Sequence, residues 1–248
     1  MIALPIAQAA VPRGIGLLEW LGDLDTWLGP DGILSSGLDT VTLCAAVMGT
    51  GILLALPPAA LLAHLRRGEL TATALVTLGR AVPTFAVAAL LVPVALRRGW
   101  GFEPWPIFLA LLLLALPPLY LNTYTAIRHV DQGTVDAARA MGFGERSILF
   151  RVEFALAISV VFTGIRVAAV QVVATEPIRA FLGGDGLGRY VRDGLGQNNE
   201  TLIIGGALLI AALAATTSLV VTLLERVTVP HGVRRLRLQT ASRRGSIG

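Results

Sequence analysis

The sequence DAARAMG, residues 136–142, lies in a charged interval between two long apolar stretches, and VEFA, residues 152–155, follows it after nine residues. We interpret residues 136–142 as a short amphipathic helix at a membrane surface. Asp136 is placed at its start, where the helix dipole favours a negative charge. The two alanines after it leave a shallow surface, and Gly142 permits a sharp turn. A helix end built from small residues suits insertion into a cleft on a partner protein; an ordinary membrane-surface linker is the alternative.

The composition indicates a membrane protein. Of the 248 residues, 54% are hydrophobic and only 15% are charged, and the mean hydropathy is +0.72, which exceeds what a soluble core of this size requires. All 20 basic residues are arginine. Because they lie in short segments between apolar stretches and in the tail, rather than on one soluble face, we expect no nucleic-acid binding. The single cysteine, Cys44, provides neither a disulfide nor a thiolate metal cluster within the chain.

Five stretches are long enough to cross a hydrocarbon core, which takes about 20 helical residues. Residues 41–65, 105–127 and 201–224 contain no charged side chain, whereas 70–96 holds Arg80 and 154–175 holds Arg166. Prolines lie inside several of these stretches, but bundled transmembrane helices tolerate proline where neighbours satisfy the freed carbonyls. The fold class is therefore an all-α membrane protein with about five transmembrane helices.

The amino-terminal segment, residues 1–37, lacks a basic region, so we do not interpret it as a cleaved signal. Residues 15–28 carry Trp20 and Trp27 among three acidic side chains, which predicts an interfacial helix with aromatic anchors. One membrane domain follows at 38–228, with the helical loop at 128–152 inside it. An arginine-rich tail, residues 229–248, completes the chain.

The distribution of arginine predicts the orientation. If the five stretches cross in series with the amino terminus outside, the inner segments hold 12 arginines and the outer segments hold 6. The positive-inside rule then places the amino terminus outside the cell membrane and the carboxyl terminus in the cytoplasm. Residues 136–142 fall on the cytoplasmic side, although the count makes no use of that motif.

Residues 136–142 and 152–155 together resemble the EAA loop, EAA-x3-G-x9-I-x-L-P, of the permeases of ATP-binding-cassette (ABC) importers. The resemblance implies the type I importer permease fold. It also implies that the short helix couples the chain to a cytoplasmic ATPase through Asp136, Ala137, Ala138 and Gly142.

Flanking motifs resemble the branch of this family that takes up osmoprotectants such as glycine betaine, carnitine and choline. The resemblance extends over roughly residues 38–232. The matching stretches are AVPTFA (81–86), NTYTAI (122–127), GIR (164–166), FLGGDGLGRY (181–190), IGGA (204–207) and ER (225–226).

The chain departs from the family pattern at several positions. Asp136 replaces the usual first glutamate and keeps the negative helix start, whereas Ala155 and Ser159 stand where prolines are usual. Without a proline ring at these positions, we expect a more continuous path from the short helix into the fourth span. Glu176-Pro177 replaces small neutral residues before the glycine-rich loop, which suggests an altered substrate path.

The resemblance also suggests a translocation pathway and an outer gate. In the glycine-rich loop, closely spaced glycines let the backbone turn tightly where a binding protein docks; a plain flexible connection is the alternative. Arg166 should face the bundle interior, because a charge in mid-span is seldom kept towards lipid. It lines the path, pairs with an acid such as Glu176, or binds carbonyls freed by a proline. Tyr120 and Tyr124 offer aromatic faces to a quaternary ammonium, with core packing as the alternative. The candidate pathway and gate residues are Tyr120, Tyr124, Arg166, Glu176, Gly184, Gly186 and Gly188.

Other chemistry has little support in the sequence. Arg80 lies near a span end, from which its side chain reaches the interface. His64, His129 and His231 show no metal-ligand spacing, and no acid pair or activated nucleophile appears, so we expect no catalytic residue, metal or cofactor in this chain.

The sequence therefore predicts a transport subunit, not an enzyme: a multi-pass permease of the cell membrane that imports an osmoprotectant. No Walker A motif is present, so ATP and Mg²⁺ are expected in a separate ATPase dimer. The other expected partners are a second permease, identical or homologous, an extracytoplasmic solute-binding protein and the lipid membrane. A permease for methionine or another small solute, an ion-coupled secondary transporter and a membrane enzyme remain the alternatives.

Overall fold

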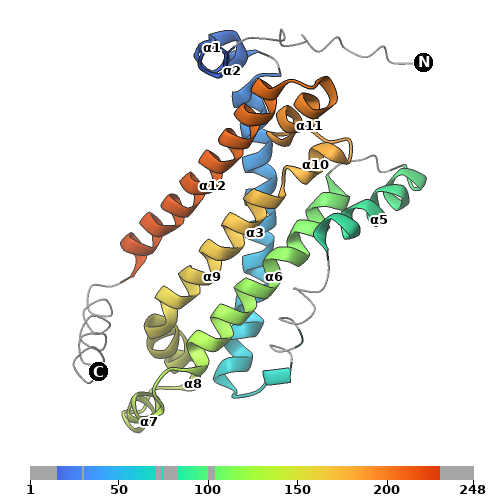
Figure 1. Ribbon diagram of the computed structural model, residues 1–248. Coiled ribbons are helices and arrows are strands. Elements are labelled where there is room, and N and C mark those ends of the chain that lie inside the picture. The colour runs from blue at the N-terminus through green and yellow to red at the C-terminus, as the bar shows by residue number, and fades with distance from the viewer. Residues whose placement is uncertain (1–15, 30, 71–73, 75–82, 100–103, 230–248) are drawn as a thin grey trace, which may run out of the picture.

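A computed structural model describes residues 16–29, 31–70, 74, 83–99 and 104–229. Its described residues form helices and contain no strand, which confirms the predicted all-α class (Figure 1). The elements are α1 (Leu17–Gly22), α2 (Leu24–Leu28), α3 (Ile33–His64), α5 (Thr84–Arg97), α6 (Trp105–Arg128), α7 (Gln132–Ala140), α8 (Glu145–Ser147), η1 (Ile148–Glu153), α9 (Phe154–Thr175), α10 (Ile178–Phe181), α11 (Gly188–Gln197) and α12 (Glu200–Thr228).

Four helical stretches of the described chain are long and apolar enough to cross a membrane: Leu24–His64, Trp105–Arg128, Glu145–Phe181 and Glu200–Thr228. They correspond to four of the five predicted spans. The fifth is represented by α5, an apolar helix of 14 residues. Most of the first half of that predicted span, with Arg80, lies outside the described residues, as do residues 1–15, His231 and all but the first residue of the predicted tail.

The helix α3 begins at Ile33 rather than at residue 41, where the uninterrupted apolar run starts. Its extra turns mix polar and apolar side chains, and the polar Ser36 and Thr40 are buried at 3% and 1% exposure. The helix therefore continues past the apolar segment because its outer end packs against protein, which hydropathy alone does not register.

Helices α3, α6 and α9 pack against one another and form the centre of the bundle, with α5 on α6 and α12 on α9 and α11 (Figure 1). Small residues recur on α3 at every fourth position, namely Gly51, Ala55, Ala59 and Ala63, and all four are buried. Such spacing places them in one stripe and lets helix backbones approach closely in a membrane. At Gly51 an added Cβ would lie 3.0 Å from the Leu119 side chain of α6. Packing of small against large residues thus sets the α3–α6 contact.

A second, smaller core closes one end of the bundle, which we call the outer end after the predicted orientation of the chain. Trp20, Ile33, Leu187, Tyr190 and Leu202 form this cluster. Trp20 is only 2% exposed, and its ring fills the space beside Gly205 of α12, where a side chain would collide with it. The predicted role of Trp20 as a membrane anchor is therefore wrong, because its ring packs inside the protein.

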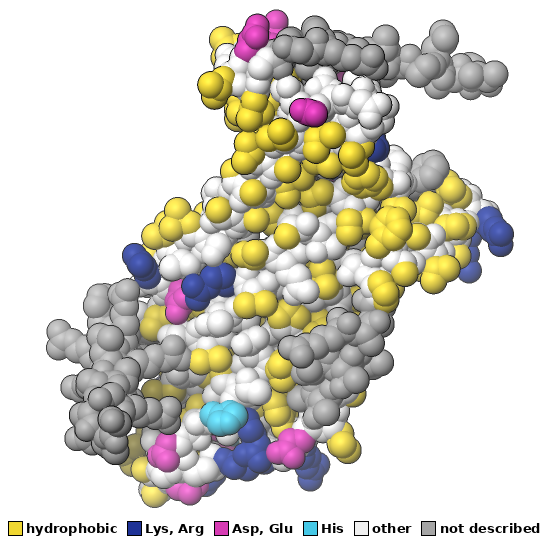
Figure 2. Space-filling model, viewed as in Figure 1, with side chains coloured by type: hydrophobic (Ala, Val, Ile, Leu, Met, Phe, Trp, Pro, Cys, Tyr) yellow, Lys and Arg dark blue, Asp and Glu magenta, His cyan; other side chains and the backbone are white. Residues whose placement is uncertain are grey.

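Figure 2 shows hydrophobic side chains over the middle of the molecule and most charged side chains towards its two ends. Figure 1 places α1, α2, α10 and α11 at the outer end and α7 and α8 at the opposite end, which we call the coupling end after the role predicted for α7. An apolar belt between two polar ends is the surface that a bilayer requires.

Candidate functional site

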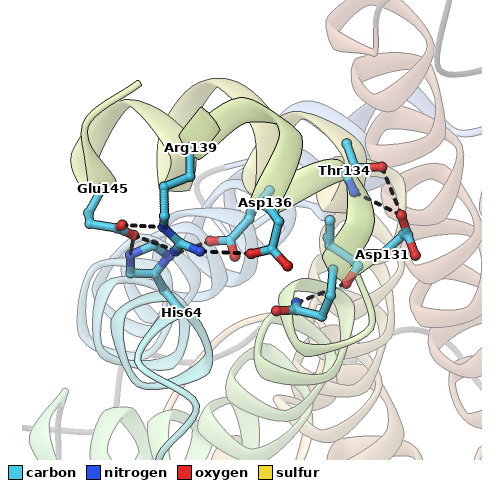
Figure 3. Close-up of polar contacts among 9 residues, drawn as sticks. His64, Asp131, Thr134, Asp136, Arg139 and Glu145 are labelled. Carbon is cyan, nitrogen blue, oxygen red and sulfur yellow. Dashed lines mark hydrogen bonds and ion pairs between the residues drawn. The ribbon is translucent and has the colours of Figure 1, made fainter. Parts of the chain in front are cut away.

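The helix α7 at the coupling end begins earlier than predicted. It runs from Gln132 to Ala140, with Asp131 at the N-cap. The Asp131 carboxylate accepts hydrogen bonds from the backbone N–H of Thr134 at 2.9 Å and from its hydroxyl at 3.0 Å (Figure 3). These bonds, the backbone one first, hold the pKa of Asp131 below its ordinary value. The prediction that Asp136 starts the helix is wrong, because Asp131 already caps the free amides of the first turn.

One face of α7 packs on the protein and the other is exposed. Val135 and Ala138 are buried at 2% and 3% exposure, whereas Asp136, Ala137 and Ala140 are exposed. Of the two alanines predicted to form a shallow outer surface, only Ala137 does so. Ala138 packs inward because it lies three residues after Val135, on the same side of the helix.

The end of α7 forms a Schellman motif. The backbone N–H of Phe143 donates to the Ala138 carbonyl at 3.2 Å, and that of Gly142 donates to the Arg139 carbonyl at 3.0 Å. Gly142 has φ +86°, the left-handed conformation that this motif uses. The prediction of a sharp turn at Gly142 is confirmed. The turn leaves Met141 70% exposed and Phe143 39% exposed, so the tip of α7 presents apolar side chains to its surroundings.

A chain of polar contacts connects α7 to the end of α3 (Figure 3). Arg139 contacts Asp136 at 2.9 Å and forms a two-point contact with Glu145, at 2.7 and 3.0 Å. The ring of His64 lies 3.3 Å from Glu145 and 2.6 Å from Glu153. Glu145, followed by Asp136, raises the pKa of Arg139. These contacts could not be predicted from sequence spacing, because some of them, such as that of His64 with Glu153, join residues 89 positions apart.

From Glu145 to Thr175 the chain runs through α8, η1 and α9 in succession, and η1 is a π-helical segment of six residues. The helical path through Ala155 is thus continuous, as predicted from the absence of the motif proline. A π-helical segment contains a locally widened turn, and such turns are frequent at functional sites.

The glycine-rich loop lies at the outer end, between α10 and α11, and it is tightly packed. Gly184, Gly186 and Gly188 are all buried. Gly186 has φ +95°, and a Cβ on it would lie 2.8 Å from the Thr40 hydroxyl; a Cβ on Gly188 would collide with the Pro177 backbone. Glycine is required here for backbone conformation and close approach, so the loop is not a plain flexible connection.

Buried polar groups fix this loop to α3 and α9. Glu176 is fully buried and accepts a hydrogen bond from the Thr40 hydroxyl at 3.1 Å, while Arg179 lies 3.3 Å from its other oxygen. The Thr40 hydroxyl in turn accepts the backbone N–H of Leu187 at 3.0 Å. Arg192 donates to the carbonyls of Ala180 and Gly184. In this conformation the Glu176 carboxylate is therefore bound to Thr40 and Arg179 in the protein interior and is not accessible from the surface.

Arg166 faces the protein, as expected, but its partner differs from the one suggested. It contacts Glu225 of α12 at 3.1 Å and donates to the Thr222 hydroxyl at 3.3 Å. The suggested pairing with Glu176 is wrong because Glu176 lies at the outer end of α9, ten residues further along the helix. Arg166 thus connects α9 to α12, and its side chain remains 32% exposed.

Tyr120 and Tyr124 stack on each other, with ring centroids 6.1 Å apart and planes at 8°. Both are buried, at 5% and 4% exposure, and neither hydroxyl has a hydrogen-bond partner among the described residues. A cation could reach these rings only if the bundle opened.

His129 is exposed and contacts the Thr125 carbonyl of its own helix. Within the described ranges, no group of three or more His, Cys, Asp or Glu side chains is arranged to hold a metal ion.

The fold is that of a type I ABC importer permease. It is similar to a solved structure of the MetNI methionine ABC transporter in an inward-facing conformation, with a TM-score of 0.67 and 17% sequence identity over 79% of this chain and 95% of that chain.

The sequence model of the binding-protein-dependent transport system inner membrane components matches residues 48–231, and the chain belongs to this family. It is 30% identical to the choline transport system permease protein OpuBB of Bacillus subtilis strain 168, over 80% of this chain and 88% of the relative. It is also 30% identical to the carnitine transport permease protein OpuCB of Listeria monocytogenes, over 79% and 87%. The osmoprotectant import permease protein OsmW of Salmonella typhimurium strain LT2 is 30% identical over 77% of this chain and 89% of its own length. The predicted family is confirmed.

Proposed function

We propose that the chain is the permease subunit of an ATP-driven importer for choline, carnitine, glycine betaine or a related osmoprotectant. The observation that carries this proposal is the 30% identity with a choline permease along 88% of that relative. The likeness to the methionine transporter has 17% identity and supports the fold only. We therefore place methionine as the competing solute in the test.

In this proposal α7 is the coupling helix. Its exposed side, with Asp136 and Ala137, and the turn at Gly142 enter a cleft on a cytoplasmic ATPase dimer, which binds ATP and Mg²⁺. Two observations support this assignment: α7 stands at one end of the apolar bundle (Figure 1), and its tip exposes Met141 and Phe143 without a partner surface among the described residues. Exposed apolar groups of this kind mark contact surfaces on proteins.

The outer loop completes the proposed cycle. A solute-binding protein docks at the outer end and releases its solute to a path between this chain and a second permease. Gly184, Gly186 and Gly188 shape the loop at the entrance, and Tyr120, Tyr124 and Arg166 belong to helices that rearrange as the path opens. The ATPase closes on ATP, moves α7 and shifts the bundle from inward-open to outward-open; ATP supplies the differential affinity for the two states.

Reconstitution tests this function. The chain is purified with the ATPase that co-purifies with it, placed in proteoliposomes and supplied with its binding protein. We expect ATP-dependent accumulation of radiolabelled choline or glycine betaine. Accumulation of methionine without any quaternary amine would overturn the solute assignment, and uptake that persists without an ATPase would overturn the ABC mechanism in favour of a secondary transporter.

A further inference from the structure

The last residue of α3, His64, lies between two carboxylates that belong to other elements. Its Nδ1 is 2.6 Å from Glu153 of η1 and its Nε2 is 3.3 Å from Glu145 of α8. Both ring nitrogens of an imidazole can form hydrogen bonds, so His64 contacts the two carboxylates at once. The His64 side chain is 9% exposed and that of Glu153 is 6% exposed, so the shorter of the two contacts is shielded from water.

The contacts continue from Glu145 to α7. Arg139 binds Glu145 through two nitrogens, the paired geometry that gives an arginine–carboxylate contact its directional specificity. Arg139 also contacts Asp136 on the exposed side of α7. An uninterrupted polar path thus leads from the proposed ATPase-binding surface to the end of α3 (Figure 3).

Apolar packing between the same elements is confined to one side, where Ala60 and Ala63 of α3 and Ile148 and Leu149 of η1 belong to the buried core. A groove of about 670 Å³ separates α3 from the segment formed by α8, η1 and the start of α9. Pro57 and Leu61 line it on the α3 side, and Leu149 and Phe150 line it on the other. His64 and Glu145 belong to the lining as well. The polar contacts therefore cross this groove beside the apolar core.

The bridge formed by these contacts reaches the π-helical segment at its last residue, Glu153. Glu153 is 4% exposed, and a buried carboxylate left without its partner is strongly unfavourable. Contact with His64 therefore holds Glu153, and with it this end of η1, in one position relative to α3.

We infer that His64 is a positioning residue that transmits the displacement of α7 to α3. The inference rests on the proposed function. When the ATPase moves α7, Arg139 and Glu145 carry His64 with them, and α3 moves with its packed partner α6. Without the bridge, the polar connection from α7 to α3 is broken and the displacement of α7 is not passed to α3.

The test follows α3 directly and needs no transported solute. In a Cys44→Ser background, spin labels are placed at Leu38 of α3 and Leu224 of α12, which are 61% and 54% exposed. Electron–electron distances are measured in proteoliposomes containing the ATPase complex, with and without ATP plus vanadate. We expect a nucleotide-dependent change in distance in the parent protein. In His64→Leu the nucleotide-free distance stays as in the parent and the change is lost; His64→Gln, which keeps a donor, restores part of it.

Two further variants separate transmission from folding. Glu145→Ala removes a residue whose side chain is 56% exposed, and Glu69→Ala is its matched control, an exposed acid at the same end that pairs with Arg128 at 3.7 Å. We expect Glu145→Ala to lose the distance change and to raise the ATP hydrolysed per solute transported about fivefold or more, the lower range of coupling between sites. Glu69→Ala keeps parent values. His64→Leu/Glu153→Leu, which removes both buried polar groups, inserts normally and lacks the change.

The outcomes distinguish the two proposals. A parent protein without any nucleotide-dependent distance change or ATP-driven uptake overturns the proposed function together with the bridge. A responsive parent with equally responsive His64→Leu and Glu145→Ala overturns the bridge alone. A broadened nucleotide-free distance in every His64 variant, including His64→Gln, assigns His64 a structural role and also overturns the bridge.

Discussion

At the scale of single residues, Gly142 determines whether the turn after α7 can form. Its φ of +86° lies in the left-handed region, and nothing lies within 4 Å of the place where a Cβ would stand. A substitution is therefore unfavourable because of backbone strain and not because of a collision. For an ordinary residue this strain is of the order of 1–2 kcal/mol.

Gly142→Val should abolish uptake and the stimulation of ATP hydrolysis while leaving membrane insertion intact, because the strain displaces the tip of α7 from the partner cleft. Gly142→Asn is the matched control, since asparagine adopts the left-handed conformation more readily. Transport and ATPase assays on the two reconstituted variants check this expectation. Normal uptake by Gly142→Val would contradict a coupling role for the turn.

Residue-level expectations were confirmed where local chemistry decides the conformation. The turn at Gly142 and the inward side of Arg166 followed from a missing Cβ and from the cost of a charge facing lipid. The partner of Arg166 could not be predicted in this way. It depends on which helix lies beside α9, and Glu225 becomes a neighbour only after α9 and α12 have packed.

At the scale of elements, α7 illustrates what a motif reveals and what it leaves out. The pattern DAARAMG indicated a short helix, but the helix starts at Gln132, four residues before Asp136, with Asp131 as its capping residue. The sequence does contain a signal for this earlier start. In Asp131-Gln132-Gly133-Thr134 an N-cap residue stands three positions before the backbone amide of Thr134, which it caps. The buried stripe of α3 was also readable, because Gly51, Ala55, Ala59 and Ala63 repeat every four residues.

The N-cap of α7 should respond to acid. The hydrogen bonds from Thr134 lower the pKa of Asp131 in the folded protein, so the stabilisation by the cap is complete above the ordinary pKa of about 4 and is lost as the pH falls through the lowered value. Amide hydrogen exchange, corrected for intrinsic rates, should show α7 losing protection at its first turn under those conditions.

Two variants check the origin of this acid response. Asp131→Ala should lack the protection at every pH, whereas Asp131→Asn, which keeps the acceptor oxygen, should retain it without pH dependence. Equal protection of the first turn in the parent and in Asp131→Ala would show that packing by Val135 and Ala138, rather than the cap, holds the start of the helix.

At the scale of the whole molecule, composition and hydropathy were sufficient for the fold class, because a bilayer restricts spanning structures to a few solutions. They were insufficient at the outer end. There α3 extends into a protein-packed region, and the glycine-rich loop is held by Thr40, Glu176 and Arg179. Such buried polar contacts depend on tertiary packing, so a hydropathy profile does not register them.

The predicted orientation is testable by labelling. In a Cys44→Ser background, a cysteine at Leu18, which is 86% exposed in α1, should react with a membrane-impermeant maleimide added to intact cells. A cysteine at Met141, 70% exposed at the tip of α7, should react only after the membrane is permeabilised, because the arginine distribution places α7 in the cytoplasm. The reverse pattern would remove α7 from the compartment in which ATP is available.

The packing of Trp20 against Gly205 has a practical consequence. The family match begins at residue 48, and a shortened chain designed from that boundary would lack both the indole ring and the first turns of α3. The space beside Gly205 of α12 would then be empty. Tyr190 would also lose its edge-on aromatic contact with Trp20, whose ring centroid lies 5.5 Å away. Expression trials with such a shortened chain should therefore give a molecule whose outer end is loosened, even though every residue of the recognised homology region is retained.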